Sequence, residues 1–164
     1  YLFSPDDVVK YRKELNIKEH NDSTIKEDFF EFLEERDYSL SYKMPFLLAI
    51  VKHIDSIGDA KIEEVLDDYI AFYQDRLSRG LQVDRSTCPY DEKMLKDRKA
   101  VQRNMLTNPF EKFERKRFLY YSKDLSVISM NHALFGQMKA EDWERVRRQM
   151  REDLRKYYNG MGGV

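Results

Sequence analysis

The sequence predicts a mainly α-helical domain with one β-hairpin and a winged-helix-like core. Apolar residues recur every three or four positions through most of the chain, as they do along one face of a helix. Glycine and proline are scarce, with 6 and 4 in 164 residues, so the connecting loops should be short. Only the runs Phe118–Tyr121 and Ser126–Met130 favour strands, and the polar pair Lys123-Asp124 between them predicts a hairpin turn.

The first forty residues predict an acidic helical segment. Ser4 before a proline is typical of a capped helix start, and this helix should run toward Leu15. A second helix begins at Asp22 or Ser23 and has one apolar and one acidic side. We expect its apolar side to pack on the rest of the chain.

Two strongly patterned helices follow and should form the centre of the core. Met44-Pro45 begins a helix that is apolar nearly all round, and Gly58 is expected to end it. From Ile62 the apolar residues step by three or four, with charged residues between them, until Gly80.

The second half begins with a loop and ends with a long helix. Leu81–Tyr90 has no helical period, so we expect a loop of about ten residues there. Asp91 is a plausible cap for a helix to about Leu106, and Pro109 begins another helix. After the hairpin, apolar residues at helical spacing predict a final helix that stops at Gly160.

This order of elements is that of a winged-helix domain. In such a domain a three-helix unit presents one helix to a nucleic-acid groove, and the hairpin contacts the backbone beside it. We therefore divide the chain into residues 1–40, an acidic helical segment packed on the core, and residues 41–164, the winged-helix-like helical domain.

Charge is segregated along the chain, although the net charge is only −1. Residues 1–92 contain 12 Lys and Arg against 21 Asp and Glu, residues 93–123 contain 10 against 3, and residues 124–164 contain 7 against 6. A locally basic face attracts phosphate even on a neutral protein, because the field acts over a Debye length of about 10 Å. The candidate nucleic-acid contacts are Lys96, Arg98, Lys99, Arg103, Lys112, Arg115, Lys116, Arg117 and Lys123.

Other interpretations of the charged segments stay open. A run of basic residues is often only a solvated face. In the final helix, acidic residues stand three or four positions from basic ones, which predicts a salt-bridged surface helix rather than a binding face.

The sequence shows no catalytic or cofactor motif. Neither G-x-x-x-x-G-K-[ST] nor G-x-G-x-x-G occurs, and His20, His53 and His132 lack metal-ligand spacing. Cys88 is the single cysteine and predicts a loop thiol in a reducing, cytoplasmic compartment. The longest apolar run is too short to span a bilayer. We predict no enzyme activity, cofactor, metal, small-molecule substrate or membrane partner.

Several short sequence segments in the middle of the chain together carry a resemblance to a known family. They are Ser41-Tyr42-Lys43 with Phe46–Ile50, Tyr73–Arg76 with Gly80-Leu81, and Asn108-Pro109-Phe110 with Phe113-Glu114, followed by the hairpin. Together they resemble the region after the motor in bacterial superfamily II DEAD/DEAH-box helicases related to restriction and phage-defence systems. The resemblance implies an accessory domain whose partners include the motor domains of the same parent chain. No catalytic residue is carried over, because the motor motifs are absent.

These observations lead to two functional hypotheses. The first is a noncatalytic accessory domain of a helicase-like translocase that contacts DNA or RNA through a basic helix and the hairpin. The alternative is a protein-docking module that uses Phe29, Phe30 and Phe32 of the acidic segment Glu27–Asp37. A third possibility is that the acidic segment covers the basic one and regulates it. The chain begins with Tyr1 rather than Met, which suggests a longer parent polypeptide.

Overall fold

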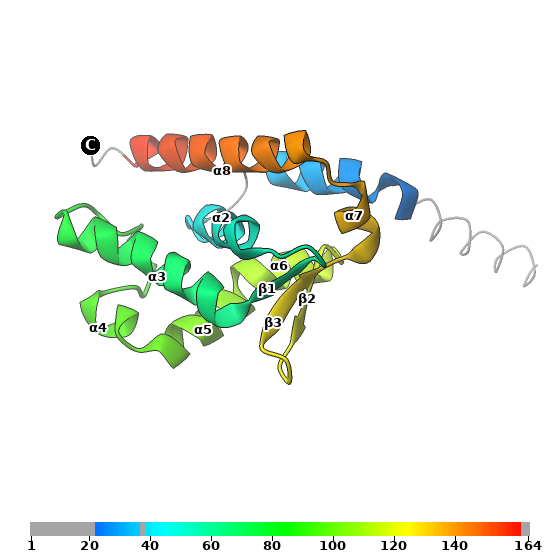
Figure 1. Ribbon diagram of the computed structural model, residues 1–164. Helices are drawn as coiled ribbons and strands as arrows, with labels where there is room; N and C mark the ends of the chain where they lie inside the picture. Colours follow the sequence, from blue (N-terminus) through cyan, green and yellow to red (C-terminus); the bar gives the residue numbers. More distant parts are fainter. Residues whose placement is uncertain (1–21, 37–38, 162–164) are drawn as a thin grey trace, which may run out of the picture.

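The computed structural model describes residues 22–36 and 39–161 (Figure 1). The helix expected between Ser4 and Leu15 lies outside the described residues. A helix covers residues 22–34. The remaining elements are α2 (Lys43–His53), β1 (Asp59–Lys61), α3 (Ile62–Ser78), α4 (Glu92–Leu95), α5 (Arg98–Thr107), α6 (Pro109–Arg115), β2 (Leu119–Ser122), β3 (Val127–Met130), α7 (His132–Gln137) and α8 (Ala140–Gly160).

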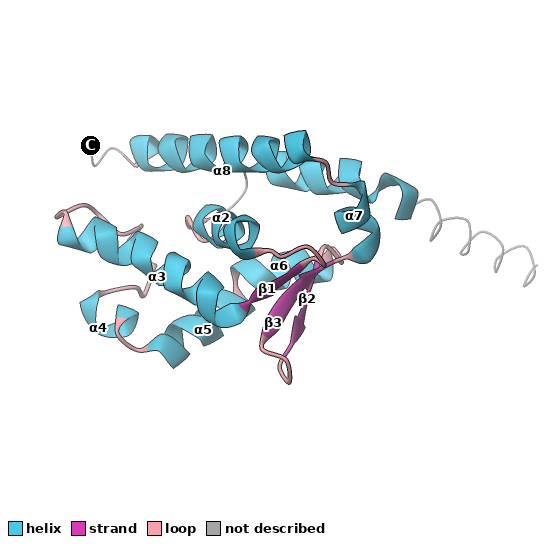
Figure 2. Ribbon diagram, viewed as in Figure 1, coloured by secondary structure: helices cyan, strands magenta, loops and turns pink. Residues whose placement is uncertain are grey.

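The architecture confirms the predicted helical domain with a β-hairpin. Figure 1 shows α8 and the helix over residues 22–34 along one side of the molecule, α2 beneath them, and α3, α4, α5 and the hairpin turn on the other side. Helix α2 packs against both α3 and α8, so it lies at the centre of the core, as its apolar sequence predicts. Figure 2 shows how small the sheet is beside the helices.

The sheet has one strand more than the predicted hairpin. Its order is β1-β3-β2, and both pairs are antiparallel, with Asp59 opposite Ser129 and Leu119 opposite Met130. Strand β1 has only three residues, so it has no sequence period of its own and exists because β3 pairs with it.

Gly58 has a different role from the expected one. Helix α2 already ends at His53, and Gly58 occupies the turn into β1 with φ of +90°. Only glycine adopts this backbone conformation readily. A Cβ atom here would also lie 3.2 Å from the ring of Phe135.

The single helix expected from Asp91 to about Leu106 is two helices. Asp91 does cap the first, α4, by accepting a hydrogen bond from the Met94 amide at 2.8 Å. Asp97 then accepts one from the Ala100 amide at 3.2 Å and begins α5. An aspartate inside a helical pattern can accept a hydrogen bond from a backbone amide and so begin a new helix, and Asp97 divides the expected helix in this way.

The long loop before α4 is fixed by a buried carboxylate. Asp84 is only 5% exposed, and its Oδ2 accepts hydrogen bonds from the amide and the hydroxyl of Ser41 at 2.9 and 2.6 Å. Its Oδ1 accepts from the Arg85 amide at 2.7 Å and the Tyr157 hydroxyl at 2.5 Å. The loop, the start of α2 and the end of α8 are therefore tied together.

Candidate nucleic-acid interface

Three of the nine predicted cations form ion pairs with acidic side chains. Arg98 of α5 bridges to the first turns of α3, where its Nε lies 2.9 Å from a Glu63 carboxylate oxygen and its Nη1 lies 2.8 Å from an Asp67 oxygen. Two others pair within one helical turn: Lys96 with Glu92 at 3.3 Å, and Arg115 with Glu111 at 3.5 Å. Arg98 therefore links α5 to α3, whereas the pairs of Lys96 and Arg115 are local and exposed.

The other six cations are exposed and have no ion-pair partner among the described residues. They lie on three successive elements: Lys99 and Arg103 on α5, Lys112 on α6, Lys116 and Arg117 after α6, and Lys123 in the hairpin turn. Helix α5 and the hairpin turn both lie on the side of the molecule away from α8 (Figure 1). Unpaired, solvated cations are the groups that neutralise phosphates and so release the counterions condensed on a nucleic acid.

Arg117 has an unusual backbone for its residue type. The Phe118 amide donates to the carbonyl of Phe113 and the Arg117 amide donates to that of Glu114, both at 2.9 Å, which is a Schellman motif at the end of α6. Arg117 occupies the left-handed position with φ of 67°, where glycine is usual. The chain therefore keeps an arginine where it costs about 1 kcal/mol of backbone strain. Strained residues of this kind cluster at functional sites.

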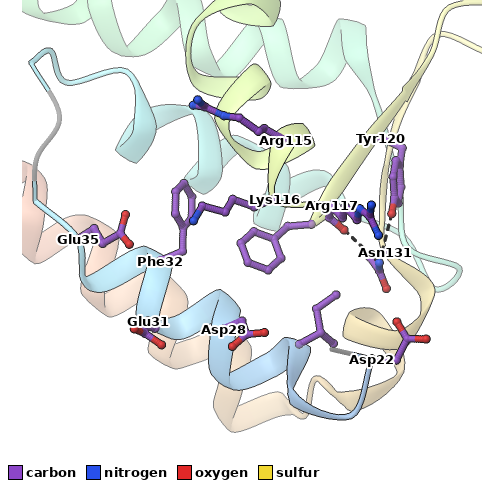
Figure 3. Close-up of a pocket in the computed structure, with 12 residues that line it drawn as sticks. Asp22, Asp28, Glu31, Phe32, Glu35, Arg115, Lys116, Arg117, Tyr120 and Asn131 are labelled. Atoms are coloured by element: carbon purple, nitrogen blue, oxygen red, sulfur yellow. Dashed lines mark hydrogen bonds between the residues drawn. The ribbon is translucent and has the colours of Figure 1, made fainter. Parts of the chain in front are cut away.

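A polar network fixes the turn that carries Arg117. Asn131 caps α7 by accepting hydrogen bonds from the amides of Ala133 and Leu134. Its Nδ2 donates to the Arg117 carbonyl at 3.0 Å and to the Tyr120 hydroxyl at 3.3 Å (Figure 3). Asn131 and Tyr120 were not predicted as site residues, since only the folded chain brings them beside Arg117.

A groove of about 570 Å³ separates this turn from the helix over residues 22–34. One wall consists of Arg115, Lys116 and Arg117, and Figure 3 shows the Lys116 side chain extending toward Phe32. The opposite wall is acidic, and its members are Asp22, Asp28, Glu31 and Glu35. Among the described residues no ion pair joins the two walls.

The acidic helix is fixed to the core by its other face. Phe29 and Phe32 are buried and make edge-to-face or tilted ring contacts with Phe118, and Phe32 also meets Phe113. The buried Lys43 donates from its Nζ to the carbonyls of Phe32 and Glu35 at 2.7 and 3.2 Å, and so caps the end of the helix.

Ion pairs also hold the acidic helix against α8. They are Lys26 with Asp142 at 3.0 Å, Arg145 with Glu34 at 3.4 Å, and Arg36, just beyond the helix, with Asp153 at 3.2 Å. Hydrogen bonds from Lys26 and from the Lys139 amide keep the pKa of Asp142 below its usual value, although burial alone would raise it. The two helices thus form one layer.

These contacts bear on the docking hypothesis. Phe29, Phe30 and Phe32 are at most 8% exposed, so they belong to this domain's own core while the helix stays in place. Only the acidic face of the helix is available to a partner. Removing a phenylalanine would therefore damage the fold, and it would not test docking.

The described residues hold no group of histidine, cysteine and acidic side chains suited to a metal ion. His53 is half-buried between Asp68 at 2.8 Å and Glu64 at 3.3 Å, so both of its ring nitrogens have acidic partners. Burial raises the pKa of Cys88, so its thiol is not activated as a nucleophile. In the part of the chain described, no helix has both the length and the hydropathy to cross a membrane.

Comparison of the chain with family models, with curated proteins and with solved structures finds no match.

Proposed function

We propose that this chain is a noncatalytic accessory domain that contacts DNA or RNA through the unpaired cations of α5, α6 and the hairpin turn. The observation that carries the proposal is that six exposed cations of one short basic segment have no acidic partner among the described residues. Phosphate contact requires long cationic side chains on an exposed face. The segment provides them on the helices and hairpin of a winged-helix-like arrangement.

The parent enzyme in this proposal is a helicase-like translocase whose motor lies elsewhere in a longer polypeptide, and the setting is cytoplasmic. Support for this part comes from the sequence strings around α2, α3 and α6 that resemble the helicase accessory region. The domain itself would hold the strand, while the motor would supply ATP hydrolysis.

Fluorescence anisotropy with labelled single-stranded and duplex DNA and RNA tests the proposal. We expect the double variant K99A/R103A to bind about 10-fold more weakly at about 50 mM salt and to reduce the slope of log affinity against log salt by about two. The matched control is R148A/R151A, which removes from α8, on the other side of the molecule, two exposed arginines that have no ion-pair partner in the described part of the chain.

The control should change the affinity by less than about twofold. Absence of binding to every strand at low salt would refute the proposed function. Equal losses in the two double variants would show that binding depends only on net charge and has no defined face.

A further inference from the structure

The acidic wall of the groove must act on any anion that reaches the basic wall. Glu31 and Glu35 are exposed, and their carboxylates have no ion-pair partner among the described residues. Lys116 and Arg117 on the other side are likewise exposed and unpaired. Figure 3 shows the acidic side chains along one helix and the basic turn facing them across the open space.

The acidic and basic side chains line one groove of about 570 Å³, so their charges act within the same small space. Salt screens exposed charges over about 8 Å at physiological ionic strength, and a groove with low-dielectric walls focuses the field of the charges that line it. A phosphate group bound to Lys116 or Arg117 within the groove is therefore incompletely screened from the carboxylates opposite. Those carboxylates repel it.

The helix that carries the acidic wall is anchored to the rest of the domain. It is held by the buried Phe29 and Phe32, by the Lys43 cap and by the pairing of Lys26 with Asp142. Because these contacts hold the helix in place beside the groove, the carboxylates can act on the basic turn without any movement of the helix.

We propose that the acidic side chains of the helix over residues 22–34, together with Glu35 just beyond it, are an electrostatic filter for the basic turn Arg115–Arg117. It weakens phosphate binding at Lys116 and Arg117, so that the contact with a polyanion depends mainly on α5, on Lys112 of α6 and on the hairpin turn. The inference rests on the proposed function for the identity of that polyanion as DNA or RNA.

The test neutralises the filter without changing side-chain volume. The variant E31Q/E35Q should bind single-stranded DNA and heparin about threefold to tenfold more tightly than the wild type at low salt, and the gain should shrink as salt rises. The control E64Q/E141Q removes two exposed carboxylates that do not line the groove, one of which, Glu64, lies 3.3 Å from His53. Thermal unfolding of each variant verifies that the fold is retained.

A second comparison shows which residues cause the tighter binding of E31Q/E35Q. In the background K116A/R117G, which keeps the turn conformation, the gain from E31Q/E35Q should disappear, because the two pairs of residues are coupled across the groove. An equal gain in the control, or an unchanged gain in the K116A/R117G background, would overturn the filter.

Heparin separates this inference from the proposed function. If the gain occurs with heparin while no DNA or RNA binds to any variant, the filter stands and the proposed function fails. If DNA binds but E31Q/E35Q shows no gain with either probe, the filter fails and the proposed function stands. No gain and no nucleic-acid binding would refute both.

Discussion

Two sides of this molecule use charged and hydroxyl side chains in opposite ways. On the side formed by α8 and the loop before α4, most of these groups are paired with one another. Arg147 pairs with Glu144, and Arg155 and Lys156 pair with Glu152. On the side formed by α5, α6 and the hairpin turn, six of the nine predicted cations are unpaired among the described residues.

This difference in ion pairing between the two sides shows that a count of basic residues does not locate a binding face. Helix α8 is as rich in arginine as the basic segment, yet most of its cations already have partners three or four residues away or on the neighbouring helix. Partners at those spacings satisfy the cation in the folded domain. A cation attracts phosphate strongly where it lacks such a partner.

The largest expected effect is that of alkaline pH on the buried tyrosines, and it should destabilise the whole domain. Burial raises the pKa of Tyr69, Tyr73, Tyr90, Tyr157 and Tyr158, and also that of Tyr42, well above the ordinary value. In the unfolded chain these hydroxyls ionise near pH 10, while in the folded chain they stay neutral. The unfolded state therefore loses protons that the folded state keeps, and stability falls as pH rises.

The free energy of unfolding should be constant up to about pH 9 and fall by at least about 3 kcal/mol by pH 11. Urea unfolding at a series of pH values measures it. An unfolding free energy independent of pH across this range would show that the tyrosines are not buried as described.

The buried carboxylate gives the next largest effect. Asp84→Asn leaves one acceptor oxygen where four hydrogen bonds now end, so we expect a loss of about 2–3 kcal/mol in the free energy of unfolding. Binding of DNA at a temperature where the variant is folded should be unchanged. The control Asp124→Asn, at an exposed residue of the hairpin turn, should cost less than about 0.5 kcal/mol. Urea unfolding and anisotropy together check this separation, and it fails if Asp84→Asn reduces binding as much as K99A/R103A does.

Sequence reasoning predicted the elements that carry local signals. The apolar steps of α3, the cap at Asp91 and the start of α6 at Pro109 confirm it. The salt-bridged surface of α8 was predicted too, because its partners lie within one helical turn. In each case the interaction that decides the structure joins residues close together in the chain.

The features that sequence reasoning missed depend on residues far apart in the chain. Strand β1 exists through pairing with β3, about seventy positions later. Glu31 and Arg117 form opposite walls of one groove, although no local pattern relates them. Nor does any spacing show that Arg98 is held by Glu63. These contacts follow from tertiary packing, which overrides what a single segment indicates.

The smallest expected effect comes from making α8 a second binding face. The variant E144Q/E152Q removes the partners of Arg147, Arg155 and Lys156 while keeping the glutamate volumes. Single-stranded DNA should then bind about threefold more tightly at low salt, with a steeper salt dependence, because three further cations are able to exchange counterions. Anisotropy against the wild type measures the gain, and K99A/R103A supplies the background. If the pairing of cations determines which side binds, the gain should persist in the K99A/R103A background, because the new contacts lie on α8. A gain that vanishes in the K99A/R103A background would mean that the ion pairs on α8 do not restrain its cations.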